Sequence, residues 1–170
     1  MSGTSIINML KIQYNDSYNM LKEFVRVCPD DLWRAENHGL PLWNHVAHSL
    51  CGTAFWLRTD YNSDLEWYFP FPESVKDKLE KDEWCRPEEG FMTKEQVNVC
   101  FDILDKKLDE FWSSLNDDML GNKLLEQFDF TYLSAITSQI RHIMCHVGMC
   151  SAALIENGFD EVKWIAYGEG

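Results

Sequence analysis

The chain has 170 residues, a formal net charge of −13 and six cysteines. This length suits a single domain over residues 1–170, which buries roughly 70% of the surface that the unfolded chain exposes. The acidic balance argues against proteins that bind nucleic acid or anionic membranes, because that binding depends on clustered Lys and Arg. The cysteines form no CxxC pair, and no basic, apolar leader is visible. We therefore expect a cytoplasmic protein with reduced thiols.

Four segments have the pattern of amphipathic or buried helices. The first repeats apolar residues every three or four positions and carries its charges elsewhere on the wheel. The second opens at Pro41, which suits a first helical position because its missing N–H would be unpaired there. The third begins with Thr93 and Gln96 in capping-box spacing, and the fourth stops at Gly158. The expected helices are Ser5 to Cys28, Pro41 to Arg58, Thr93 to Leu115 and Thr131 to Asn157.

The connections between these helices are unequal in length. The segment from Thr59 to Met92 is long, irregular and contains three prolines. A long crossover of this kind is compatible with a bundle, and no stretch alternates strongly enough to demand a sheet. Leu65 to Phe71 is rich in aromatics and is either a short extended piece or a lid. We expect an all-α fold, a four-helix bundle with a long crossover between the second and third helices.

One uncharged segment raises the alternative of a membrane span. Asn37 to Leu57 contains no charged residue over its whole length. It does contain several polar side chains. Placing each of them in lipid without a hydrogen-bond partner costs on the order of a few kcal/mol. A buried helix in a soluble bundle is the better interpretation.

The histidines are the strongest indication of chemistry in the sequence. His142 and His146 are four residues apart, so on a helix they stack on one face about 6 Å apart and can share one metal ion. His48 lies on a second uncharged helix, and residues of facing helices meet inside a bundle. The pattern predicts a metal site of three histidines. The alternative is that each is a core or interface histidine satisfied by a hydrogen bond.

Three neutral imidazoles leave at least one coordination position open to water or substrate. Zinc or nickel is the divalent ion that we expect first, and iron is also chemically acceptable. His45 precedes His48 by three residues on a neighbouring face. His45 could replace or supplement His48 as a ligand, donate a hydrogen bond to a carboxylate outside the ligand set, or serve only in packing.

Two segments carry a resemblance to a known family. WNHVAHSLCGTAFWL (Trp43 to Leu57) and RHIMCHVGMCSAAL (Arg141 to Leu154) resemble the two signature helices of the DinB/YfiT-like superfamily. The resemblance implies a four-helix bundle in which His48, His142 and His146 bind a divalent metal. Many members carry an acidic residue one turn after the first histidine, whereas this chain has Gly52 there.

The resemblance also implies a function. Members include metal-dependent transferases that join a low-molecular-weight thiol, such as bacillithiol, mycothiol or glutathione, to a small electrophilic substrate. Arg141 and Arg58, with Arg34, are candidates to bind a carboxylate of the thiol, and Trp67 and Tyr68 are candidates to line the substrate site. The alternatives are a metal-dependent hydrolase, for which no general base is evident near the ligands, and a non-catalytic, metal-binding or stress-associated dimeric bundle.

Two further expectations concern cysteines and assembly. Cys51 and Cys145 each follow a predicted ligand by three residues, but packing is favoured over a nucleophilic role because helical cores use cysteine freely.

The second and fourth helices have more uncharged surface than one bundle core requires, which predicts a homodimer. Alternatively, the crossover and residues Val162 to Tyr167 cover that surface within one chain.

Overall fold

The computed structural model describes residues 5–37, 39–61, 69–79, 81, 83–86, 88–126 and 129–170, and its regular structure is almost entirely helical. This confirms the all-α prediction. Its elements in chain order are α1 (Ile6–Val27), α2 (Asp30–Arg34), β1 (Glu36–Asn37), β2 (Leu40–Pro41), α3 (Leu42–Trp56), α4 (Glu73–Leu79), α5 (Lys94–Ser113), a 3₁₀ turn η1 (Asp117–Met119) and α6 (Tyr132–Glu156).

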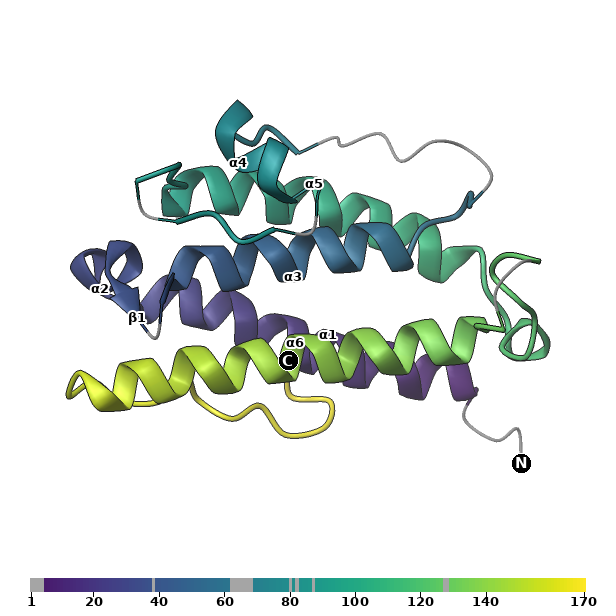
Figure 1. Ribbon diagram of the computed structural model, residues 1–170. Coiled ribbons are helices and arrows are strands. Elements are labelled where there is room, and N and C mark those ends of the chain that lie inside the picture. Colours follow the sequence, from purple (N-terminus) through teal and green to yellow (C-terminus); the bar gives the residue numbers. More distant parts are fainter. Residues whose placement is uncertain are drawn as a thin grey trace.

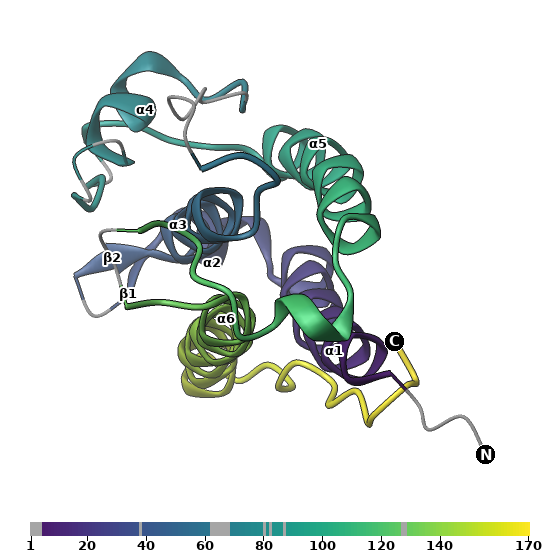
Figure 2. The same ribbon diagram turned by 90° about the vertical axis from the view of Figure 1, so that its right-hand side faces the viewer.

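The four long helices α1, α3, α5 and α6 lie side by side along one direction (Figure 1). Seen along that direction they occupy four corners, with α4 outside α3 and α5 (Figure 2). Helix α6 packs against both α1 and α3, and α5 packs against α3. The pairing of α3 with α6 brings the two histidine-bearing helices together.

Large aromatic and aliphatic side chains fill the space between the helices. Trp33, Trp43 and Phe111 are among the largest fully buried side chains. The indole Nε1 of Trp33 donates to the Met92 carbonyl oxygen at 2.8 Å, so its polar atom is satisfied inside the core. The buried set extends from α1 through α6 without a break, and it fixes the distance between α3 and α6.

The helix ends follow local sequence signals. Thr93 and Gln96 form both hydrogen bonds of the predicted capping box, and Thr131 accepts from the backbone N–H of Ser134. Gly158 follows α6 with φ of +81°, a conformation that glycine adopts without strain. The prediction that Pro41 is the first helical residue was wrong by one position. Pro41 is the extended N-cap residue, because it also pairs with Glu36 in the short β hairpin.

Several short elements were not predicted. The hairpin β1–β2, the five-residue α2 and the seven-residue α4 all lie in connections between the long helices. Elements of this length span one or two turns at most, so they leave no hydrophobic periodicity to detect. Of the aromatic segment Leu65 to Phe71, residues 65–68 lie outside the described residues, while Phe69 and Phe71 are buried with ring centroids 5.2 Å apart.

The uncharged segment that raised the membrane alternative forms the hairpin and α3. Its polar residues Asn44, Ser49 and Thr53 are buried inside the protein. Within the described ranges, no helix combines the length and the apolar character needed to cross a membrane.

The chain beyond α6 runs back along the helices towards α1 (Figure 2). The backbone N–H of Val162 donates to the Ser151 hydroxyl at 3.1 Å, and the carboxylate of Asp16 accepts from Gly168 and Gly170. Residues Val162 to Tyr167 therefore fold back on the helices of the same chain, as predicted. Trp164 nevertheless remains 68% exposed, so the segment covers only part of the surface beside it.

Candidate metal centre

Helices α3 and α6 bring the three predicted ligands together. His48 comes from α3, and His142 and His146 come from successive turns of α6. The ring centroid of His48 lies 5.1 Å from that of His142 and 5.2 Å from that of His146. One ring nitrogen from each lies within 4.8 Å of the others, and across the described chain this is the only cluster of His, Cys, Asp or Glu with that geometry.

The geometry fits a single divalent ion. The Nε2 atoms of His142 and His146 are 3.0 Å apart. Two nitrogens that bind zinc at about 2.0–2.1 Å in a tetrahedron are about 3.3 Å apart, so this pair is already close to its liganded spacing. His146 is buried at 5% exposure, whereas His48 and His142 are half-buried. The half-buried pair leaves one side of the cluster accessible to an external ligand.

The environment keeps His146 in the form that binds metals. Burial, followed by the neighbouring histidines, lowers the pKa of His146 from 6.5 to about 3. The ring is therefore neutral at physiological pH, and a neutral imidazole is the ligand form. A histidine buried for packing alone would also be neutral, so the converging nitrogens and not the pKa distinguish the site.

His45 contacts the opposite side of the His146 ring. Its Nδ1 lies 3.1 Å from Nδ1 of His146, while Nε2 of His146 faces His142. Burial lowers the pKa of His45, and the ring is only 8% exposed. Of the roles that the sequence left open, this geometry favours the outer hydrogen-bond partner over the direct ligand.

Gln139 contacts the corresponding position on His142. Its Oε1 lies 3.3 Å from Nδ1 of His142, three residues along the same helix, and its side chain is buried. Gly52 makes this contact possible. A Cβ atom at residue 52 would lie 2.8 Å from Cε1 of His142 and 3.4 Å from Oε1 of Gln139. A side chain at residue 52 would therefore displace the histidine, the glutamine or both.

Trp84 forms one wall of the cluster. Its ring centroid lies 4.7 Å from that of His48, 5.5 Å from His45 and 6.1 Å from His146. The segment that carries it is held on α3, because the side-chain amide of Asn44 donates to the Cys85 carbonyl at 2.7 Å. Trp84 was not among the residues predicted for the site. The sequence does contain a signal for it, because Trp84 is an aromatic residue of the same crossover as the predicted site residues Trp67 and Tyr68.

The other candidate residues are dispersed. Arg141 is exposed on α6 next to His142. The guanidinium of Arg58 lies over the rings of Phe55 and Tyr61, and that of Arg34 lies over Phe91. Their predicted role at a thiol carboxylate stays a prediction. Trp67 and Tyr68 lie outside the described residues.

The two cysteines near the histidines differ in environment. Cys51 is buried, and burial raises the pKa of its thiol well above the ordinary value, which disfavours the nucleophilic thiolate. Cys145 is exposed on α6. The structure thus supports packing as the role of Cys51.

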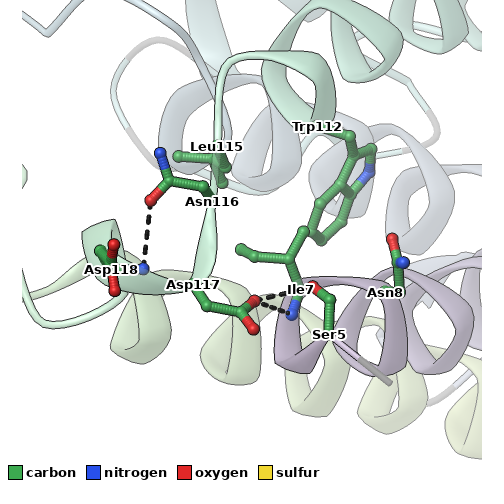
Figure 3. A pocket seen from close by; sticks show the side chains of 8 residues that line it. All are labelled: Ser5, Ile7, Asn8, Trp112, Leu115, Asn116, Asp117 and Asp118. Atoms are coloured by element: carbon green, nitrogen blue, oxygen red, sulfur yellow. Dashed lines mark hydrogen bonds between the residues drawn. The ribbon is translucent and has the colours of Figure 1, made fainter. Parts of the chain in front are cut away.

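A separate, open pocket of about 450 Å³ lies between the start of α1 and the segment after α5 (Figure 3). The carboxylate of Asp117 accepts from the Ser5 hydroxyl and from the backbone N–H groups of Ile6 and Ile7. These hydrogen bonds lower its pKa and satisfy two of the backbone N–H groups at the start of α1. The carboxylate that lines this pocket therefore serves to cap helix α1.

Comparisons with protein-family models, with curated proteins and with solved structures find no match for this chain.

Proposed function

We propose that this chain is a divalent-metal protein of the DinB/YfiT-like kind, a four-helix bundle in which His48, His142 and His146 bind the ion. The observation that carries the proposal is the convergence of three ring nitrogens, from two helices, within 4.8 Å of one another. The ion's open position would face the side where His48 and His142 are half-buried. The residues fit zinc or nickel best, with iron as a further candidate.

The activity that we propose is transfer of a low-molecular-weight thiol, of the bacillithiol, mycothiol or glutathione type, to a small electrophile. A divalent ion lowers the pKa of a bound thiol and holds the thiolate in place. In the transfer the thiol proton passes to solvent, the sulfur electron pair forms a carbon–sulfur bond, and the leaving group departs with the pair of the broken bond. The chain's own residues would hold the ion and wall the site with Trp84.

The hydrolase alternative has less support from the site. Hydrolysis at a metal centre usually needs a general base beside the ligands. No Asp or Glu joins the histidine cluster in the part of the chain that the structure describes. The remaining alternative is a metal-binding or stress-associated bundle without catalysis.

The test begins with elemental analysis of protein purified without a metal-affinity tag, beside the His142→Ala variant. About one ion per chain in the parent and little in the variant supports the site. The loaded protein is then assayed for conjugation of glutathione or bacillithiol to chlorodinitrobenzene. Turnover that depends on both the ion and the thiol supports the transferase, whereas a bound ion without turnover supports the non-catalytic bundle.

We also propose that the protein is a homodimer. Helix α6 exposes Leu133, Met149 and Ile155 at 41%, 50% and 56%, although the C-terminal segment covers neighbouring surface. A two-fold interface is the commonest way to bury such residues. Light scattering that gives about twice the 19.9 kDa chain mass supports the dimer. A monomer mass at every concentration eliminates it.

A further inference from the structure

Trp84 is a partly exposed aromatic side chain that packs directly on the histidine cluster. Its ring centroid lies 4.7 Å from that of His48, with 31° between the two ring planes. It lies 5.5 Å from the ring of His45 and 6.1 Å from that of His146. The indole therefore borders two of the three candidate ligands, and 37% of the residue remains exposed to solvent.

This exposure distinguishes Trp84 from the tryptophans that serve in packing. Trp33, Trp43 and Trp112 are buried in the core. A single exposed apolar side chain is common on protein surfaces and by itself indicates no function. Trp84 differs from such a surface residue in two respects, because it contacts candidate ligands and because the chain next to it is held in place.

The segment that carries Trp84 packs against both α3 and α4. The side-chain amide of Asn44 donates to the carbonyl oxygen of Cys85 at 2.7 Å, and Cys85 is fully buried. A Cβ atom at residue 90 would lie 2.9 Å from Cγ2 of Val75 and 3.0 Å from Sγ of Cys85, so the glycine at this position permits the close approach. Trp84 is therefore anchored through its buried neighbour.

Two ion pairs join the same segment to α4. The ammonium group of Lys78 lies 3.4 Å from the carboxylate of Glu83 and 3.0 Å from that of Glu89. Each pair is partly exposed and contributes little by itself. With the buried contacts, they hold the chain on both sides of Trp84. A ligand that binds against an indole held in this way loses little affinity to the ordering of the side chain.

We infer that Trp84 contacts the ligand at the open position of the metal centre and that this ligand carries a flat aromatic ring, which stacks on the indole. The inference rests on the proposed function, because it takes the ion to lie among His48, His142 and His146. Aromatic rings attract one another in offset-stacked or edge-to-face contacts. The Trp84 ring already contacts two of the candidate ligands, so a group bound beside them is within its reach.

The charge of the ion selects among the groups that bind to an indole. Tryptophan also binds organic cations over its face, but a divalent ion close by repels a second positive charge. An aliphatic group gains only from the burial of apolar surface, whereas a flat ring gains from burial and from stacking. A neutral aromatic ring therefore fits best. In the proposed transfer this ring belongs to the electrophile, since the thiol supplies the sulfur that binds the ion.

The test compares two probes that share one metal-binding group. Benzohydroxamate and acetohydroxamate bind divalent ions through the same pair of oxygens, and they differ in carrying a phenyl ring or a methyl group. Each is titrated into the cobalt(II)-loaded protein, whose visible absorption reports the ligands at the open position. We expect the parent protein to bind benzohydroxamate at least about tenfold more tightly than acetohydroxamate.

Variants of Trp84 separate stacking from general packing. Trp84→Phe keeps a flat ring and should retain the preference for benzohydroxamate. Trp84→Leu keeps apolar bulk without a flat face, and Trp84→Ala keeps neither, so in both the preference should fall below about threefold. Trp164→Ala removes an exposed indole from the C-terminal segment and should leave the parental preference unchanged.

The cobalt content of each variant is measured beside the titrations, because Trp84 also packs on His48. A residue that only supports His48 would change the affinity for both hydroxamates equally. A residue that stacks on the ligand changes the affinity for benzohydroxamate alone. If Trp84→Ala loses the ion, the comparison of Trp84→Phe with Trp84→Leu decides the result.

The outcomes separate this inference from the proposed function. A parent protein that binds no cobalt overturns both. A parent that binds cobalt without preferring benzohydroxamate, or a Trp84→Leu variant with the parental preference, overturns the inference alone. The expected preferences in a protein that does not conjugate glutathione or bacillithiol support the aromatic contact and overturn the transferase.

Discussion

Two clusters of polar side chains in this protein differ in the hydrogen-bond partners that they offer one another. At the start of α1, the carboxylate of Asp117 receives hydrogen bonds from Ser5, Ile6 and Ile7. At the centre of α3 and α6, nitrogens of the α6 histidines face each other at 3.0 Å. The first cluster pairs one carboxylate with three donors at a helix end. The second brings together three imidazoles whose ring nitrogens lie within 4.8 Å of one another, so that they can share one metal ion.

The difference indicates how to separate structural from functional polar groups in a helical protein. A capping carboxylate should affect stability and leave ligand binding alone, because its partners are all backbone or hydroxyl groups of one helix end. At neutral pH a histidine cluster should affect ligand binding far more than stability. Four predictions test this separation.

The largest effect is expected at the ligands. His48→Ala, His142→Ala and His146→Ala should each reduce the metal content from about one ion per chain to less than about a tenth of that, because each removes one of three donors. His45→Ala should keep most of the metal at high protein concentration, since loss of an outer partner weakens affinity without removing a donor. Elemental analysis after extensive dialysis measures both.

Two outcomes would change this interpretation. Variants that unfold without the ion would make the site structural, because the free energy of metal binding would then belong to folding. Full metal content in all three variants would show that the ligands lie elsewhere.

The next effect concerns the segment that carries Trp84. Asn44→Ala removes the donor to the buried Cys85 carbonyl, so we expect the free energy of unfolding to fall by about 1–3 kcal/mol. Asn98→Ala, at an exposed position of α5, should change it by no more than about 0.5 kcal/mol. Urea denaturation measures both. Equal, small effects would mean that the Asn44 contact does not hold the segment on α3.

The third effect is a pH dependence from His146. The folded-state pKa is lowered to about 3 from 6.5, so the unfolded chain binds a proton below pH 6.5 that the folded chain does not. The stability contribution of this group is complete above pH 6.5 and is lost as the pH falls towards 3, at up to about 1.4 kcal/mol per pH unit. Urea midpoints of metal-free protein across this range measure it. His146→Leu should reduce the slope by about one proton, and an unchanged slope would contradict the assignment.

The smallest effect is expected at the capping pocket. Asp117→Asn keeps one acceptor oxygen and loses the charge that favours the N-terminus of α1, so the melting temperature should fall. In the parent protein the contribution of Asp117 is complete above the ordinary aspartate pKa of 3.8 and is lost as the pH falls through its lowered value. Asp118→Asn is the matched control, because it is the exposed neighbouring carboxylate.

The zinc affinity of the Asp117→Asn variant tests whether the capping cluster and the histidine cluster act independently. Asp117→Asn should bind zinc as the parent does. A loss of zinc affinity in this variant would show that the two clusters are coupled through α1 and α6.

Local sequence signals specify the long helices and their ends. Thr93, Thr131 and Gly158 act through partners within one helical turn, so each signal is complete in the local sequence. The spacing of His142 and His146 likewise places both rings on one face of any helix that contains them. These features need no knowledge of how the helices pack.

The packing of the helices, in contrast, determines which groups surround those histidines. His48 and His45 are three residues apart on α3, and the rotation of α3 against α6 makes the first a member of the ligand cluster and the second a partner of His146. Gly52 permits the contact of His142 with Gln139, and Trp84 of the crossover packs against His48. Such contacts join residues distant in sequence, and no local periodicity specifies them, because they depend on how two helices and a connection pack together.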